Sequence, residues 1–202
     1  MLYLARHAQP LIAAGTCYGQ LDVAADAIAT HQAAQALAAV LPPKTVVISS
    51  TLQRCEQLSN EIRRLQPDFT YKTDQNLQEM HFGNWEGRLW ADIAPSELAD
   101  WTADFAHYRV GRLGGSLAGE SVSQFMARVA LSFDALTCAK PVHPTLWITH
   151  AGVIRAAGLL ARGMRHVNDA KDWPVDAPAF GQWCTLGAYP NLSTIAAPTA
   201  LI

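Results

Sequence analysis

Two histidines in the sequence each follow a short apolar run that has the composition of a buried strand. Residues 2–5 (LYLA) lead into Arg6 and His7, and residues 146–149 (LWIT) lead into His150. A neutral imidazole can attack phosphorus and form a phosphohistidine. The phosphoryl group then needs positive charge around its oxygens, which guanidinium groups supply in a permanently charged fork. The two histidines therefore predict one shared phosphoryl-transfer site with Arg6 beside it.

Two further kinds of group are needed for this chemistry. Arg54 falls in the first turn of a predicted helix, where free backbone N–H groups also favour an anion, and we expect His150 to add another donor. A leaving alkoxide needs a proton, so a carboxylic acid must stand near the phosphorus. Residues 77–88 supply two candidates, Glu79 and Glu86, and the residues alone leave the choice open.

Strands and helices are predicted to alternate along the chain. Apolar or β-branched runs predict strands over 2–6, 45–49, 69–72, 144–149, 183–188 and 192–196. Helical spacing predicts helices over 27–41, 52–65, 121–137 and 152–162, with Ser50 or Thr51 as the cap of the second. This alternation indicates an α/β fold, a three-layer α/β/α sandwich with a mostly parallel central sheet. Ligands of such sheets bind beyond the carboxyl ends of the strands, where Arg6, His7, Arg54 and His150 are expected.

Length and composition predict one domain. The chain has 202 residues, of which 50% are hydrophobic, and this is ample for a packed core. We therefore expect a single domain over residues 1–202. A segment rich in Gly and Trp at about 77–119 is predicted to be an irregular insertion over the sheet edge, and residues 163–182 to be a loop.

The charge balance and the cysteines limit the classes of partner and the cellular location that we expect for the protein. The balance of 15 basic against 17 acidic residues argues against a nucleic-acid partner. No apolar run reaches the ~20 residues of a membrane span, and no signal peptide is recognisable. The four cysteines are widely separated, which disfavours a zinc site and favours free thiols in the cytoplasm. The oligomeric state is not fixed by these features.

Four segments resemble the histidine phosphatase (phosphoglycerate mutase-like) superfamily. They are Arg6-His7, residues 49–54 (SSTLQR), residues 77–87 (LQEMHFGNWEG) and residues 149–155 (THAGVIR). All four occur in the family's order along the chain. The resemblance implies a phosphoglycerate mutase-like fold, a small-molecule phosphate ester as substrate, and a mechanism that uses no metal and no other cofactor.

The resemblance also assigns roles by position. It implies that His7 is the phosphorylated nucleophile, that Arg6, Arg54 and His150 bind the phosphate, and that Glu79 is the proton donor. Under this assignment all five are catalytic residues. Ala8 departs from the family, which usually has Gly after the nucleophile.

Within the superfamily the chain is most similar to the α-ribazole phosphatase branch of cobalamin synthesis, which removes the phosphate of a nucleoside 5′-phosphate. The similarity lies in residues 15–22 (GTCYGQLD), 79–87 and 119–121 (GES). Gln20 stands where this branch often has Arg and is a candidate substrate-binding residue. Two alternatives stay open: a broad-specificity phosphosugar or phosphoglycerate phosphatase or mutase, and a catalytically inactive module that binds a phospho-ligand.

Overall fold

The fold is built on one twisted sheet. The computed structural model describes residues 1–111, 118–139 and 141–186, and these form a five-stranded sheet in the order β3-β2-β4-β1-β5. The strands are β1 (Leu2–Arg6), β2 (Val46–Ser49), β3 (Thr70–Thr73), β4 (Thr145–Thr149) and β5 (Trp183–Leu186). The first four are parallel, and β5 pairs with β1 in the antiparallel direction. The strand predicted over 192–196, and the end of the one predicted over 183–188, lie outside the described residues.

Five α-helices accompany these strands in the described part of the chain. They are α1 (Ala27–Val40), α2 (Gln53–Leu65), α3 (Pro95–Ala103), α4 (Val122–Ala139) and α5 (Ala151–Ala161). The sequence predicts Ser50 or Thr51 as the cap of α2, and this prediction is wrong. Leu52 takes that position without a side-chain hydrogen bond, because the helix starts one residue later and the Ser50 hydroxyl is directed to His150. None of the helices described here is long and apolar enough to cross a membrane.

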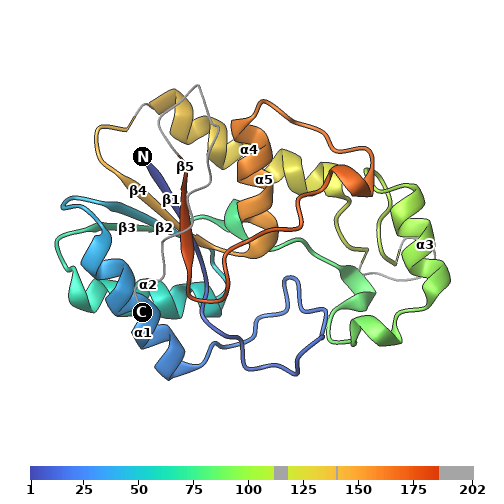
Figure 1. Cartoon of the computed structure of the whole chain (residues 1–202), viewed down its shortest axis with the longest axis horizontal. Coiled ribbons are helices and arrows are strands. Elements are labelled where there is room, and N and C mark those ends of the chain that lie inside the picture. The colour runs from blue at the N-terminus through green and yellow to red at the C-terminus, as the bar shows by residue number, and fades with distance from the viewer. Residues whose placement is uncertain (112–117, 140, 187–202) are drawn as a thin grey trace.

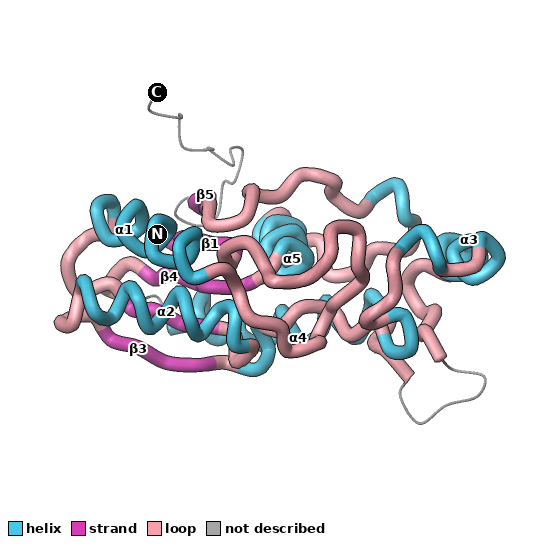
Figure 2. Tube along the Cα trace, turned by 90° about the horizontal axis from the view of Figure 1, so that it is seen from below, coloured by secondary structure: helices cyan, strands magenta, loops and turns pink. Residues whose placement is uncertain are grey.

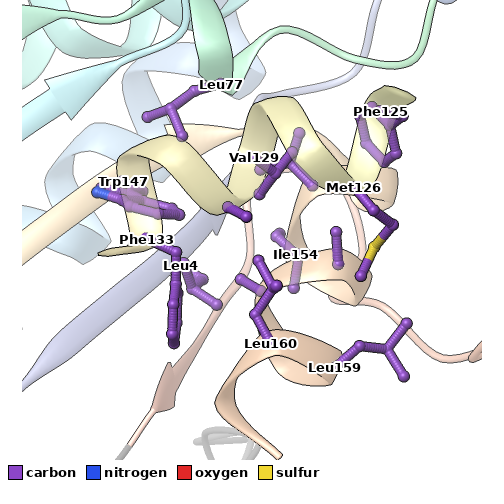
Figure 3. Packing of buried hydrophobic residues seen from close by; sticks show 14 of the residues in the cluster. Leu4, Leu77, Phe125, Met126, Val129, Phe133, Trp147, Ile154, Leu159 and Leu160 are labelled. Carbon is purple, nitrogen blue, oxygen red and sulfur yellow. The ribbon is translucent and has the colours of Figure 1, made fainter. Parts of the chain in front are cut away.

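Alternating side chains of the sheet build a core on each face, and helices lie over both faces (Figures 1 and 2). On β1, Tyr3 and Ala5 pack with α1 and α2, whereas Leu4 packs with α4 and α5. Strand β4 repeats the pattern, and its Trp147 lies on the same face as Leu4. Figure 3 shows both side chains against α4 and α5. Helices therefore cover both faces of a mostly parallel sheet, which confirms the predicted three-layer α/β/α sandwich.

The segment 77–119 differs from its prediction. It contains α3 and three short 3₁₀-helices at or near its start, η1 (Gln75–Leu77), η2 (Gly83–Trp85) and η3 (Trp90–Asp92). Some of its buried side chains form a small core around Trp85 with Cys17, Ile93 and Val110. Its Leu77, Met80 and Phe105 instead join the core beneath α4 and α5. Figure 1 places α3 at the opposite end of the molecule from the edge strand β3. Helix α3 therefore lies away from the β3 edge of the sheet, and this part of the segment is helical where the sequence predicts irregular structure.

Candidate active site

Pairing of β1 with β4 brings the two strand-ending histidines together. The register joins Arg6 with Thr149, and the His7 backbone N–H continues the ladder by donating to the Thr149 carbonyl at 3.0 Å. The imidazole centroids of His7 and His150 are consequently 5.1 Å apart, and each residue is only 1% exposed. Both lie at the carboxyl ends of neighbouring parallel strands, where ligands bind in open α/β sheets.

The environment of His7 fixes its tautomer and its charge. Nδ1 lies 2.7 Å from the Ala8 carbonyl oxygen, and because a carbonyl only accepts, Nδ1 carries the proton and Nε2 the free lone pair. Burial, together with the positive charges of Arg54 and Arg6, lowers the pKa of His7 from its ordinary value to about 3, against the opposite effect of the Ala8 bond. Near neutral pH, His7 is therefore a neutral imidazole with an unprotonated Nε2.

His150 is also held neutral. Its Nε2 lies 2.9 Å from the Ser50 hydroxyl and 3.5 Å from the Cys55 sulfur. Burial, followed by the charge of Arg54, lowers the pKa of His150 well below its ordinary value. Burial likewise raises the pKa of Cys55 to about 12, so that its sulfur stays a thiol. Neutral His150 has one N–H to donate, and its Nδ1 is buried without a partner among the described residues.

Two arginines lie against aromatic rings that are also close to His7. The Arg6 guanidinium carbon is 3.8 Å from the centroid of Phe180, and that of Arg54 is 5.0 Å from the centroid of Tyr18. The same rings flank the imidazole of His7, at centroid distances of 5.4 Å for Phe180 and 6.3 Å for Tyr18. Two guanidinium groups and two aromatic rings therefore surround the His7 imidazole, and both positive charges act on it.

Some donors of these arginines hold the surrounding loops. Arg54 donates from Nη1 to Leu21 and from Nη2 to Gly19, at 2.8 and 2.6 Å. Arg6 donates from Nη1 to the Pro178 carbonyl at 3.1 Å. Arg155 on α5 donates to the Val175 carbonyl at 2.6 Å, so two arginines hold the loop that contains Val175 and Pro178.

Other donors of the same groups have no protein partner. Five buried side-chain polar atoms in the described residues lack one, and four of them are Arg6 Nε, Arg54 Nε, Arg155 Nε and His150 Nδ1. Buried polar groups are normally hydrogen-bonded. Their concentration around His7 therefore fits an oxygen-rich anion such as a phosphoryl group.

The carboxylate of Glu79 reaches this region from the loop after η1. Its Oε2 accepts a hydrogen bond from the Gly152 N–H and its Oε1 one from the Met80 N–H, both at 3.0 Å. Gly152 is in the first turn of α5, shortly after His150. Burial lowers the pKa of Arg155, and the negative charge of Glu79 acts in the opposite direction. Glu79 and His150 thus meet at one helix N-terminus.

Glu86, the other acid candidate, is used differently. Its Oε1 accepts from the backbone N–H groups of Gln20 at 2.8 Å and Phe82 at 2.9 Å, so it joins two loops. The Gln20 side chain donates to the Glu79 carbonyl at 3.0 Å. The structure therefore brings the five catalytic candidates together, namely Arg6, His7, Arg54, Glu79 and His150, and it places Gln20 against the backbone of Glu79. A contact between Gln20 and substrate stays a prediction.

Tyr18, Phe180 and Arg155 lie at the site without having been selected from the sequence. Arg155 carried a usable signal, since it follows His150 by five residues on the helix that begins there. Phe180 carried none, because it reaches the site through an irregular loop far from His7 in the chain. Among the described residues, no group of three or more His, Cys, Asp or Glu is arranged to hold a metal ion.

Comparison with known proteins gives a consistent result. Residues 2–180 match the family model described as "Histidine phosphatase superfamily (branch 1)", whereas a search of curated proteins finds no match. The native mycobacterial glucosyl-3-phosphoglycerate phosphatase is similar in structure, with a TM-score of 0.73 and 23% identity over 91% of this chain and 87% of that chain. For the same enzyme in complex with VO₃ the TM-score is 0.71, with 25% identity over 91% of this chain and 90% of that chain. For the protein TTHB049 from Thermus thermophilus the TM-score is 0.68, with 26% identity over 97% of this chain and 98% of that chain.

Proposed function

The chain belongs to the histidine phosphatase superfamily, and on this premise we propose that it is a metal-independent phosphomonoesterase that forms a phosphohistidine on His7. One observation carries the proposal. His7 is a neutral imidazole whose Nδ1 proton is engaged by Ala8, so that Nε2 has a free lone pair, and the positive charges of Arg54 and Arg6 act on the same ring. This is the protonation state that an attack on phosphorus requires.

In the first step, His7 Nε2 forms a bond to phosphorus while the bond from phosphorus to the ester oxygen breaks. That oxygen takes the proton of the Glu79 carboxylic acid and leaves as an alcohol. Negative charge on the transferred group faces the guanidinium groups of Arg6 and Arg54, whose unpartnered Nε–H donors are buried beside His7. Fixed donors of this kind stabilise the transition state without reorganising during the reaction.

In the second step, a water molecule attacks phosphorus and the Nε2–P bond breaks. Glu79, now a carboxylate, takes the proton of that water and returns to its acid form as inorganic phosphate departs. His150 remains neutral, with Nε2 facing Ser50, and donates from Nδ1 to a phosphoryl oxygen. Each group thus ends the cycle as it began.

For the natural substrate we propose α-ribazole 5′-phosphate, on the resemblance of residues 15–22, 79–87 and 119–121 to that branch. These three segments contact one another around the proton donor: Gln20 bonds Glu79 and Glu86, and Glu120 bonds His81. These contacts explain the residues of the three segments without reference to the alcohol that the substrate releases. For this reason the substrate assignment depends on a direct comparison of substrates.

A second candidate is a phosphatase or mutase for phosphosugars or phosphoglycerates. It is supported by the likeness, at 25% identity, to an enzyme that is named a glucosyl-3-phosphoglycerate phosphatase. The third alternative, a phospho-ligand binding module without catalysis, is not favoured by the neutral state of His7, since binding alone does not need a free Nε2 lone pair.

The experiment is a comparison of phosphate release from α-ribazole 5′-phosphate, 3-phosphoglycerate and an activated aryl phosphate. We expect His7→Asn to abolish turnover of all three, and rapid alkaline quenching of the wild type to show a phosphate mass on the peptide that contains His7. His31→Asn is the matched control, since His31 is exposed on α1 and pairs with Glu61. Turnover by His7→Asn near the wild-type rate would overturn the proposal, and preference among the three substrates selects between the candidates.

A further inference from the structure

Arg128 of α4 is the most extensively bonded side chain near Glu79, although the mechanism makes no use of it. Its Nη1 donates to the carbonyls of Asn76 at 2.7 Å and Gln78 at 3.0 Å, and its Nη2 donates to that of Glu79 at 3.2 Å. These carbonyls lie at and beyond the end of η1, where a helix has no further N–H groups to offer. One guanidinium therefore holds the backbone that leads into Glu79.

The partner of Arg128 holds the backbone on the other side. Glu120 accepts from Arg128 Nε at Oε1 and from Nη2 at Oε2, both at 2.8 Å. Glu120 Oε2 also accepts from the His81 N–H at 3.0 Å, and the Glu120 N–H donates to the His81 carbonyl at 2.8 Å. The pair thus fixes the main chain before Glu79 and two residues after it.

We propose that Arg128 and Glu120 are positioning residues that hold Glu79 in the geometry for proton donation. This inference rests on the proposed function, in which Glu79 protonates the leaving oxygen. With the backbone fixed on both sides, only the side-chain torsions of Glu79 are left to vary, and the N–H groups of Met80 and Gly152 meet its two oxygens. The acid therefore starts each cycle close to its working position, which reduces the entropy cost of the step.

The chemistry of the pair explains why these residue types are needed. A guanidinium has five N–H donors in a rigid fork, so it can reach three carbonyls and chelate a carboxylate at once. A lysine keeps the charge but has a single nitrogen, which cannot span those acceptors. The pair is largely shielded, with side chains 17% and 20% exposed, so loss of one partner leaves a poorly hydrated charge.

A second ion pair on α4 provides a matched control. Arg165 donates to both oxygens of Asp134 at 2.7 Å, which is the same two-bond chemistry. Its side chains are 49% and 42% exposed, and no hydrogen bond of this pair reaches the Glu79 loop in the described structure. Asp134 is on α4 and Arg165 lies beyond the end of α5, so Arg165→Lys tests the loss of a guanidinium fork bound to α4 without a change at the acid.

Leaving-group dependence is the measurement that separates positioning from general stability. An alkyl phosphate needs a proton on its leaving oxygen, whereas an activated aryl phosphate leaves as a stable phenolate and needs little acid catalysis. We expect Arg128→Lys to lower kcat on an alkyl phosphate by about 100-fold, with KM little changed. Turnover of the aryl phosphate should be nearly preserved. Arg165→Lys should leave both substrates unchanged.

The same comparison on Glu79→Gln distinguishes the two levels of the argument. If Glu79→Gln lacks the leaving-group pattern, the acid assignment in the proposed function fails. If Glu79→Gln shows the pattern, but Arg128→Lys lowers kcat equally on both substrates or on neither of them, only the positioning role is overturned. If a thermal unfolding measurement shows that Arg128→Lys is not folded, Glu120→Gln decides by the same criterion. This variant keeps the side-chain volume of Glu120 and removes its charge.

Discussion

The carboxylate of Glu79 lies on the first turn of α5, where its Oε2 accepts a hydrogen bond from the Gly152 N–H at 3.0 Å. The approach depends on Gly152 having no side chain. A Cβ built at that position would come within 3.0 Å of the Glu79 carboxyl carbon and still closer to Oε1. Gly152, close to the proposed phosphate-binding residue His150, thus sets the space available to the Glu79 carboxylate.

Gly152→Ala should therefore lower kcat on an alkyl phosphate while leaving the protein folded. The added methyl group displaces Glu79, but alanine is a better helix former than glycine. We expect thermal unfolding to stay at or above the wild-type temperature as activity falls. Wild-type kcat in this variant would show that Glu79 does not need its bond to α5.

Stability should depend on pH through the buried histidines. The pKa of His7 is about 3 in the folded protein and near 6.5 when exposed, so the unfolded chain binds the proton more readily. The stabilising contribution of neutral His7 is full above pH 6.5, and it is lost as the pH falls from 6.5 towards 3, by at most about 1.4 kcal/mol per pH unit. Urea unfolding at pH 7, 6 and 5 should show this decline.

His7→Asn removes that titration, so its free energy of unfolding should fall less steeply than that of the wild type over the same range. His150 still contributes to the decline in this variant, because its pKa is also lowered. An identical slope in His7→Asn and the wild type would contradict the depressed pKa of His7.

Phe180→Ala should raise the pKa of His7. The Phe180 ring packs 3.8 Å above the Arg6 guanidinium and 5.4 Å from the His7 ring, and burial is the main cause of the low pKa. Removing the ring admits water, so the charged form becomes less unfavourable. NMR titration of the His7 ring measures the shift. Phe180→Leu keeps an apolar cover and should change the pKa less; equal effects of the two variants would argue against burial as the cause.

Trp85→Ala should destabilise the 77–119 segment. Trp85 is fully buried, packs against Trp90 and Trp101, and donates from Nε1 to Glu97 at 2.8 Å. Replacing a buried Trp by Ala typically costs about 3–5 kcal/mol. Urea unfolding measures the loss, and Trp85→Phe, which keeps most of the ring, should cost less. A change below about 1 kcal/mol would mean that this small core contributes little.

The sequence was sufficient to place the two histidines together. Continuous apolar strands predict a parallel sheet, and parallel strands end at the same side, so Arg6-His7 and His150 had to be neighbours once β1 and β4 paired. The helix over Pro95–Ala103 was missed, although proline at its first position and the spacing of Leu98 and Trp101 favour a helix. The density of Gly and Trp around it suggested irregular structure instead.

The role of Arg128 could not be predicted, for a physical reason. Its three carbonyl acceptors lie about 50 residues earlier in the chain, and no local pattern reports such distant contacts. A helical arginine normally faces solvent. The low pKa of His7 was likewise hidden, because it results from burial by the surrounding elements and not from its sequence neighbours.

The position of β1 in the sheet has a consequence for the order of folding. This strand comes early in the chain, yet its two neighbours, β4 and β5, begin at residues 145 and 183. Contacts of such long sequence separation close large loops and slow the folding of a domain. During synthesis, residues 2–6 must therefore wait for more than half of the chain before they can pair. His7 follows β1 directly, so the buried setting that lowers its pKa is complete only after these distant segments have come together.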